Sequence, residues 1–267
     1  MAAHRNARAA SIPKAPSNSS QRPETTRARM LAEWTLTILL YLFVTTTLLQ
    51  AYVIPTSSME NTILIGDHVF VDKLAYSPAG SVERSLLPYR EVQRGDIIVF
   101  RYPLDLDESY VKRAIGLPGD RLRIENKQVI LNGRVLREPY VIHKTNFIDP
   151  YRDNFPSAPN SQLPARALEM LARHVSDGEI IVPPGRYFAL GDNRDQSSDS
   201  RYWGFVPREN IIGKPLIVYW SYDAPTERLQ DAGISLGHLQ DVVLNFFTKT
   251  RWSRTFNLIH PYALSAP

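Results

Sequence analysis

Two adjacent serines, Ser57 and Ser58, follow an apolar stretch in the sequence IPTSSM (54–59). They could be an ordinary polar stop, or one of them could be a nucleophile. A serine hydroxyl attacks poorly unless a base takes its proton, and the usual base is histidine. None of the six histidines lies in a recognisable catalytic motif, and there is no Gly-x-Ser-x-Gly turn. His68 lies in a strand pattern, which favours a structural role, so a histidine-dependent hydrolase has little support.

A neutral lysine can replace histidine as the base, and Lys112 in SYVKRAIGLPGD (109–120) is the candidate. A lysine in water has a pKa of about 10.4, and burial among apolar groups lowers it by several units. Lys112 lies in a strand-like stretch with apolar neighbours. Arg113 points to the opposite face of a strand, so one of the two must face inward if the other faces water. A solvated lysine on a strand face is the alternative.

A third stretch, GDNRDQSSDSRYWGFVP (191–207), lies between two strand-like segments. Asp, Asn and Ser favour turns, so a polar turn is one interpretation. Three aspartates and two arginines lie close together in it. This density of opposite charges predicts buried salt bridges that make a rigid, functional loop.

The apolar segment before the serines is long enough to cross a membrane and would hold the serines close to its surface. No charged residue occurs in the 26 positions from Trp34 to Met59. This length can span a bilayer, with Trp34 and Tyr52 near the two interfaces. We expect one transmembrane helix over 31–54, ended by Pro55. A cleaved signal peptide and a buried core helix are the alternatives.

Strand-like segments make up most of the chain after the apolar one. Each is rich in β-branched and aromatic residues and has Gly or Pro boundaries. They cover residues 67–73, 95–103, 120–136, 178–192 and 211–223. Asn132-Gly133 is typical of a tight hairpin turn. A polar loop and a short helix over 143–177 interrupt the pattern, and we expect an insertion of about residues 124–186.

Charge and composition restrict the class of protein. The 267 residues carry a net charge of +4, and residues 1–30 hold six Lys/Arg and one Glu, a net +5. The remainder is therefore at −1, which argues against a nucleic-acid-binding domain. We expect a disordered basic tail over 1–30 with the N-terminus in the cytosol. The absence of cysteine excludes disulfides and thiolate chemistry.

The last segment, residues 223–267, is a C-terminal extension with a predicted amphipathic helix. Five apolar residues in it follow helical spacing: Leu239, Val242, Val243, Phe246 and Phe247. The basic sequence TKTRWSR comes next and suits a membrane surface. A terminal helix packed on the β-domain is the alternative interpretation.

Together, these segments resemble the consecutive signature sequences of bacterial type I signal peptidases. The resemblance is carried by IPTSSM, RGDIIVFRYP, YVKRAIGLPGD and GDNRDQSSDSRYWGFVP. They stand in the family's order behind one apolar segment, and the resemblance covers about residues 31–221. One departure is Asn61, where the family often has proline, which bears on the rigidity of that turn.

The resemblance implies a catalytic dyad. Ser58 matches the nucleophile and Lys112 the general base, while Ser57 matches a position of variable identity. Thr56 matches a residue whose hydroxyl helps to line the oxyanion hole, together with the backbone N–H of Ser58.

The resemblance also implies supporting and substrate-binding residues. Ser197 matches the serine that orients the lysine amine, and Asp199 and Arg201 match an ion pair that braces the site. Six residues match the lining of small S1 and S3 pockets, which would admit Ala-like side chains: Tyr52, Ile54, Met59, Ile63, Tyr110 and Val111.

The fold that the resemblance implies is mainly β. We expect an antiparallel β-sheet catalytic domain over 55–222 with an inserted β-rich subdomain, preceded by one N-terminal transmembrane helix. The expected reaction is cleavage of signal peptides from secreted preproteins after small residues at P3 and P1. No metal or other cofactor is implied. The expected partners are preproteins and the lipid bilayer, without nucleic acid.

The expected location is the cytoplasmic (inner) membrane, with the catalytic domain on its extracytoplasmic side and the chain as a monomer. Two other functions compete with this one. The Ser–Lys self-cleaving repressors use similar chemistry, but they are soluble and carry a DNA-binding module. An anchored β-scaffold without activity would not depend on Ser58.

Overall fold

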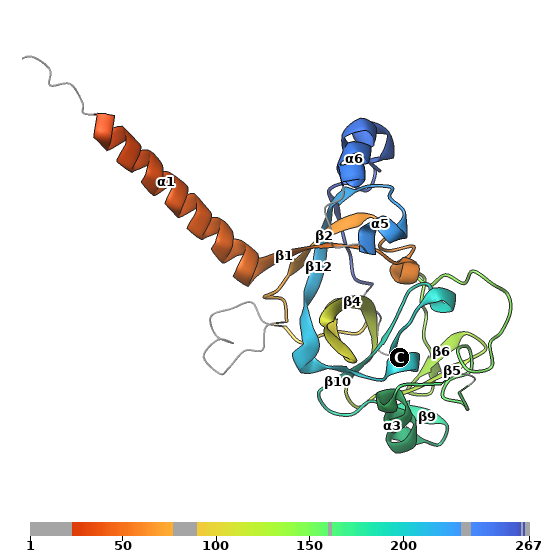
Figure 1. Cartoon of the computed structure of the whole chain (residues 1–267). Coiled ribbons are helices and arrows are strands. Elements are labelled where there is room, and N and C mark those ends of the chain that lie inside the picture. The colour runs from red at the N-terminus through yellow and green to blue at the C-terminus, as the bar shows by residue number, and fades with distance from the viewer. Residues whose placement is uncertain (1–22, 77–89, 160–161, 231–235, 263, 265–267) are drawn as a thin grey trace, which may run out of the picture. The chain divides into compact units, whose positions relative to one another are not determined.

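The computed structural model describes residues 23–76, 90–159, 162–230, 236–262 and 264. The chain divides into two compact units, Met1–Phe43 and Val44–Pro267. Within the first unit, the described residues form one helix, α1 (Pro23–Phe43) (Figure 1). The second unit holds every described strand. The two units are therefore treated separately below.

Helix α1 continues into the π-helical turn η1 (Val44–Leu48). The stretch Arg27–Leu48 is 22 residues long, is apolar enough to cross a membrane, and has none of its length buried. This contradicts the alternative of a buried core helix. An exposed apolar helix of this length agrees with the predicted span.

Both ends of the predicted helix are shifted. Residues 23–30, expected to belong to a disordered tail, are helical in α1, while residues 1–22 lie outside the described residues. The helix does not continue to Ile54, because Leu49–Val53 form strand β1 instead. β1 pairs with β2, with Tyr52 opposite Val69. This pairing satisfies backbone groups that the end of a helix leaves without partners.

The main sheet has eight antiparallel strands, in the order β1-β2-β12-β3-β4-β10-β11, with β13 also paired to β12. The strands after β1 are β2 (Asp67–Asp72), β3 (Ile97–Tyr102), β4 (Asp105–Gly116), β10 (Arg186–Leu190), β11 (Val206–Pro207), β12 (Ile211–Ser221) and β13 (Asn257–Leu258). The mainly β, antiparallel fold is confirmed.

A second, five-stranded antiparallel sheet is inserted between β4 and β10. Its order is β7-β6-β5-β9-β8. The strands are β5 (Arg121–Glu125), β6 (Gln128–Leu131), β7 (Arg134–Val135), β8 (Val175–Ser176) and β9 (Glu179–Ile181), with helix α3 (Ala165–His174) before β8. The expected start at residue 124 cuts through β5. The turn between β6 and β7 has φ of 50° at Asn132 and 79° at Gly133, in agreement with the turn expected there.

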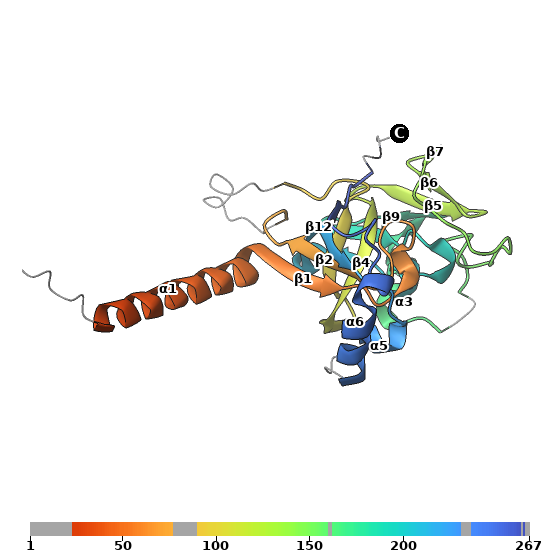
Figure 2. The same ribbon diagram turned by 90° about the horizontal axis from the view of Figure 1, so that it is seen from above.

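The remaining helices are short, except the last. They are η2 (Ser57–Met59), η3 (Arg194–Gln196), α4 (Ser200–Trp203), η4 (Arg208–Asn210), α5 (Thr226–Gln230) and α6 (Leu236–Lys249). Figures 1 and 2 show α6 projecting beyond the ends of β2 and β12, away from β5 and β6. The C-terminal extension also adds β13 to the main sheet.

Three apolar clusters fill the second unit. One lies under the inserted sheet and includes Phe155 and Phe188. A second surrounds Phe100 and Trp203. The third contains Met59 and joins the segment after β1 to strands β2, β3 and β12. The turn that carries Ser58 is thus anchored in the core by the residue that follows it.

Candidate active site

Ser58 lies in the turn η2, between β1 and β2, and its side chain is almost wholly buried. Met59 is fully buried in the third apolar cluster. Just before the turn, Ile54 is tied to the start of β2: its N–H donates to the Asp67 carbonyl at 2.9 Å, and its carbonyl accepts from Gly66 N–H at 2.8 Å. These contacts on both sides hold the Ser58 hydroxyl in one place.

Lys112 reaches Ser58 from strand β4. Its Nζ donates to Ser58 Oγ at 2.8 Å and to the Val111 carbonyl at 3.0 Å. The Tyr110 ring lies on the same amine, with its centroid 5.3 Å from Nζ. Lys112 is 4% exposed, so the structure contradicts the alternative of a solvated lysine. Nζ and Oγ are in position for direct proton transfer.

Burial lowers the pKa of Lys112 to about 8, against the opposing attraction of Asp199 and Asp192. Desolvation disfavours the ammonium form because the interior solvates charge poorly. Roughly a tenth of the molecules then carry a neutral Lys112 at pH 7, far more than for a lysine in water. A neutral amine has the lone pair that a general base needs.

Arg113 is buried as well, so neither of the two neighbouring cations faces water. It is 0% exposed and makes two hydrogen bonds to Asp192, at 2.6 and 2.8 Å. It also donates to the Gly95 carbonyl at 2.8 Å and lies 3.9 Å from the Tyr140 ring centroid. Residues 112–116 of β4 are all buried, so alternation along this half of the strand places neither side chain in solvent.

The loop after β10 packs against the turn η2 and forms hydrogen bonds with its backbone. Asn193 N–H donates to the Ser58 carbonyl at 3.1 Å, and its amide donates to the Ser57 carbonyl at 3.3 Å. Gly191 lies so close that a Cβ on it would be 2.5 Å from the Ser58 carbonyl oxygen and 2.2 Å from Ser197 Oγ. Only glycine allows this approach of the two segments.

The three supporting residues named from the resemblance lie in this loop. Arg201 holds Asp199 by two hydrogen bonds, at 2.7 and 2.8 Å, with both side chains buried. Burial raises the pKa of Asp199, but the charge and hydrogen bonds of Arg201, the Ser197 side chain and the Gly191 N–H together outweigh it, so that the pKa is lowered overall. Ser197 makes no side-chain hydrogen bond among the described residues and lies near the Asp199 carboxylate. The expected contact from Ser197 to Lys112 is thus not among the described hydrogen bonds.

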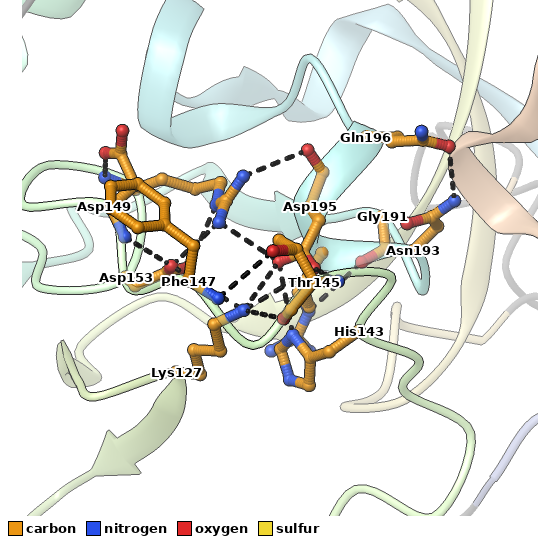
Figure 3. A network of polar contacts seen from close by, with 12 residues as sticks. Lys127, His143, Thr145, Phe147, Asp149, Asp153, Gly191, Asn193, Asp195 and Gln196 are labelled. Carbon is orange, nitrogen blue, oxygen red and sulfur yellow. Dashed lines mark hydrogen bonds and ion pairs between the residues drawn. The ribbon is translucent and has the colours of Figure 1, made fainter.

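Asp195 ties the loop to the inserted subdomain (Figure 3). Its carboxylate accepts from Lys127 Nζ at 3.2 Å and from Thr145 N–H at 2.9 Å. Arg152 Nη2 lies 3.2 Å away, and His143 Nδ1 3.4 Å away. Burial raises the pKa of Asp195, but these donors outweigh it and bring the pKa to about 2. The insertion therefore helps to position the catalytic loop.

The other charges of the loop also have partners. Asp192 pairs with Arg113, and Arg194 forms two hydrogen bonds with Glu138, at 2.5 and 3.0 Å. The expected buried salt bridges are therefore confirmed in this stretch. Because each charge is compensated, the loop can stay buried and rigid next to Ser58.

The residues expected to line the substrate pockets fall into two groups. Ile54, Met59 and Ile63 are 4%, 0% and 0% exposed and belong to the apolar core. The others, Tyr52, Tyr110 and Val111, are half-buried. Tyr52 on β1 lies beside Ser109 on β4. β1 and β4 therefore face each other next to the dyad, although three strands separate them in the sheet order.

Thr56 completes the surroundings of the nucleophile. Its hydroxyl lies 3.5 Å from Ser58 Oγ, and its side chain is accessible. No described hydrogen bond joins Ser58 to a histidine; His68 stacks on Trp220 instead, with ring centroids 4.6 Å apart. Within the described ranges, no group of three His, Cys, Asp or Glu side chains could hold a metal ion.

Sequence reasoning missed several residues that position the site. Thr62 donates to Asp192 at 2.5 Å and accepts from Arg113 at 3.2 Å, so it joins the segment after Ser58 to the buried ion pair. Arg113 and Asp192 both lie inside motifs singled out in the sequence, next to Lys112 and Gly191. Their place beside Lys112 and Gly191 was the signal in the sequence that could have identified them. Their ion pair could not be predicted from it, because the two residues are 79 positions apart in the chain.

Comparisons with known proteins identify the family of the chain. The family model "Signal peptidase, peptidase S26" matches residues 27–220, most of the chain. Signal peptidase I of Aquifex aeolicus is 34% identical over 237 residues, covering 76% of this chain and 88% of that protein. Signal peptidase I of Pseudomonas fluorescens is 35% identical over 193 residues, covering 67% of each. A crystal structure of a signal peptidase I from Enterococcus faecalis is 32% identical, with a TM-score of 0.35, and covers 47% of this chain and 97% of that one.

The family model extends from within α1 to the last residues of β12. By this evidence of sequence, the chain belongs to the signal peptidase family, peptidase S26, and is a serine endopeptidase.

Proposed function

We propose that the chain is a membrane-anchored signal peptidase I that removes signal peptides from secreted preproteins with a Ser58–Lys112 dyad. The observation that supports this most directly is the 2.8 Å contact between Lys112 Nζ and Ser58 Oγ, both almost wholly buried. A buried amine beside a hydroxyl is the arrangement that a lysine base requires.

The proposed reaction runs in two steps. Lys112 Nζ takes the proton of Ser58 Oγ while Oγ attacks the carbonyl carbon of the scissile bond. The C–N bond then breaks as the Lys112 ammonium gives this proton to the leaving amine. In the second step, water attacks the ester carbonyl while Lys112 takes a proton from it. The bond to Ser58 Oγ then breaks, Oγ receives this proton from Lys112, and the signal peptide is released.

The developing oxyanion would be stabilised by the Ser58 backbone N–H and the Thr56 hydroxyl. The 3.5 Å distance between Thr56 Oγ1 and Ser58 Oγ supports this assignment. Donors of this kind typically contribute on the order of 10²–10³ in rate. The rigid loop of Asp199 and Arg201 would keep Lys112 and Ser58 in register during the reaction.

The half-buried side chains between β1 and β4 support a preference for small residues. An extended substrate lying between these strands would place alternate side chains against Tyr52, Tyr110 and Val111. These side chains would restrict the space beside the apolar core, which favours Ala-like residues at P1 and P3. The buried Ile54, Met59 and Ile63 would form the floor of these pockets.

The location we propose is the cytoplasmic (inner) membrane, with the N-terminus in the cytosol and the unit after the span on the extracytoplasmic side. The six basic residues among residues 1–30 support this orientation, because cytosolic flanks carry excess positive charge. The dyad would then act on the side where signal peptides emerge.

The test is cleavage of a preprotein with an Ala-x-Ala site by the purified protein in detergent. Ser58→Ala and Lys112→Ala should each lower the rate by at least roughly 10³-fold, because each removes a partner in bond formation. The matched controls, Ser57→Ala and Lys144→Ala, should keep activity near that of the unchanged chain. Full activity in Ser58→Ala or Lys112→Ala would refute the dyad and leave the non-enzymatic scaffold as the better account.

A further inference from the structure

The C-terminal extension presents a set of apolar side chains to the outside. Five of them lie on α6, each 52–80% exposed, and are called the α6 patch: Leu236, Leu239, Val243, Leu244 and Phe247. Trp252 and Phe256, which follow α6, are 51% and 73% exposed. Contiguous exposed apolar side chains on this scale mark an interaction site rather than ordinary surface.

The α6 patch is one continuous stripe. Leu236, Leu239, Val243 and Phe247 recur at intervals of three or four residues, and Leu244 lies three residues before Phe247, so the five share a face of the helix. Asp241, the acidic residue of α6, lies outside the stripe, where Tyr222 Oη donates to it at 3.0 Å and Lys249 Nζ at 2.8 Å. Its side chain is 15% exposed. The stripe therefore contains no charged group.

α6 is held firmly on its other side, so the patch is not the unpacked half of a core helix. The Phe246 ring lies 6.0 Å from Trp220 on β12 and 5.6 Å from Trp252. Trp220 Nε1 donates to Thr250 Oγ1 at 3.1 Å. These contacts attach α6 to the main sheet and leave the patch facing away from it. The alternative interpretation of a terminal helix packed on the β-domain therefore accounts for the inner face of α6 but not for the exposed patch.

The basic residues near the patch are bound within the protein. Residues 242–267 contain three of them, Lys249, Arg251 and Arg254, and no Asp or Glu. Lys249 pairs with Asp241, and Arg254 pairs with Asp67. Arg251 donates to the Ile65 and Tyr222 carbonyls. An apolar helix face with tryptophan at its end suits the boundary between lipid headgroups and acyl chains.

The chain itself brings this surface near a bilayer. Trp220, under α6, is paired with His68, which is paired with Val53. Val53 is five residues after the end of the apolar stretch at Leu48. Extended residues advance about 3.3 Å each and strands lie about 4.8 Å apart, so this path is roughly 30 Å or less.

We propose that the α6 patch, with Trp252 and Phe256, docks on the surface of the bilayer that the span crosses. The partner is lipid. The span holds the chain in the membrane by one point, about which the rest could turn, and the patch supplies a second point that restricts this rotation. The proposal rests on the span and does not require peptidase activity.

The absence of cysteine makes a clean test available in the full chain. Single cysteines are introduced at Val243 and at Phe247, and Ser176→Cys on the exposed strand β8 is the matched control. Each variant is labelled with an environment-sensitive fluorophore and reconstituted into vesicles. Quenching is then measured with spin-labelled lipid and with aqueous iodide, in phosphatidylcholine with and without phosphatidylglycerol.

Docking predicts that lipid-borne quencher acts several-fold more strongly on the labels at 243 and 247 than on the label at 176. Iodide should show the reverse order, in vesicles with and without phosphatidylglycerol. Leu244→Cys replaces either variant if circular dichroism shows that it does not fold. Equal iodide quenching at all three positions would overturn the proposal.

Protection from iodide without quenching by lipid would also overturn it, because a protein would then cover the patch. Cleavage of a preprotein is measured on the same samples. Loss of cleavage with lipid quenching retained would count against the proposed function alone, so the two proposals can fail separately.

Discussion

At the scale of single residues, the proposed mechanism depends on keeping one amine neutral among several charges. Lys112 has a pKa of about 8, lowered by burial although Asp199 and Asp192 attract its charged form. Both aspartates are bound by arginines, Asp199 by Arg201 and Asp192 by Arg113. These pairs weaken the attraction that would otherwise keep Lys112 charged.

The first prediction at this scale concerns pH. A base must be neutral to act, and Lys112 is neutral above its pKa, so kcat/KM should rise with pH. The rise should approach tenfold per pH unit below about 8 and level off above it. The measurement is the initial rate of cleavage of a peptide substrate from pH 6 to pH 9.5.

His143 is the matched control for this profile. It lies 3.4 Å from Asp195 and is a titratable group close to the catalytic loop. If the lysine is the base, His143→Gln should leave the pH midpoint unchanged. A midpoint that disappears in this variant, or a rate that falls between pH 6 and pH 8, would contradict the assignment.

At the scale of elements, the site is formed where three segments of the chain meet. The turn η2 supplies Ser58, strand β4 supplies Lys112, and the loop from Gly191 to Arg201 closes behind both. Each segment is bound to the others by buried polar contacts, and the inserted subdomain holds the loop through Asp195. The geometry is therefore a property of the packing of these elements.

The prediction at this scale is that Gly191→Ala inactivates the protein. The added Cβ would lie 2.5 Å from the Ser58 carbonyl oxygen, which is backbone and cannot move aside cheaply. Separating η2 from the loop by a few tenths of an ångström should lower kcat by roughly 10²-fold. The measurement is kcat for a peptide substrate, together with the thermal unfolding midpoint.

Gly119→Ala is the matched control. A Cβ at Gly119 meets nothing within 4 Å, but the residue has a φ of +90°. It should cost stability of about 1–2 kcal/mol through backbone strain without a comparable loss of kcat. Equal losses of activity in the two variants would show that general destabilisation, and not the approach to Ser58, explains the effect.

At the scale of the whole molecule, anchoring and chemistry are divided between two units. The long helix α1 belongs to Met1–Phe43, whereas the dyad and both sheets lie in Val44–Pro267. The first unit contributes no described residue to the site. Its contribution is to keep the enzyme on the surface where membrane-bound substrates are found.

Removal of residues 1–43 is therefore expected to separate the two properties. The remaining unit should fold and cleave a short soluble peptide in detergent at a rate close to that of the full chain. Processing of a preprotein inserted in vesicles should fall by roughly 10²-fold, because the enzyme and the preprotein are no longer concentrated on the same membrane surface. The two rates are compared for both forms at equal enzyme concentration.

If the shortened form fails to cleave the soluble peptide while circular dichroism shows a folded β-protein, the first unit contributes to the site. The division into two units would then not describe the function. Equal processing of the vesicle-bound preprotein by both forms would show that the span is dispensable for access to substrate.

Much of this protein could be predicted from local patterns. An apolar run without charge identifies a span, alternating β-branched residues identify strands, and Asn132-Gly133 identifies a turn. Ser58 and Lys112 could be paired in advance because each lies in a distinctive motif, and the structure brings them within 2.8 Å of each other. These features are encoded within a few neighbouring residues.

Other features depend on partners far along the chain. Leu49–Val53 is as apolar as the helix before it and becomes a strand only because β2 pairs with it. Arg113 is buried because Asp192, Gly95 and Tyr140 surround it from three separate segments. Helical spacing predicts an amphipathic α6 whether the helix lies on a membrane or packs on the β-domain. Only the contact of Phe246 with Trp220 shows which face of the helix is exposed. Composition and spacing determined which residues could do chemistry here. Tertiary packing decided which of these residues are buried and where helix α1 ends and the sheet begins, because burial and strand pairing depend on contacts between distant parts of the chain.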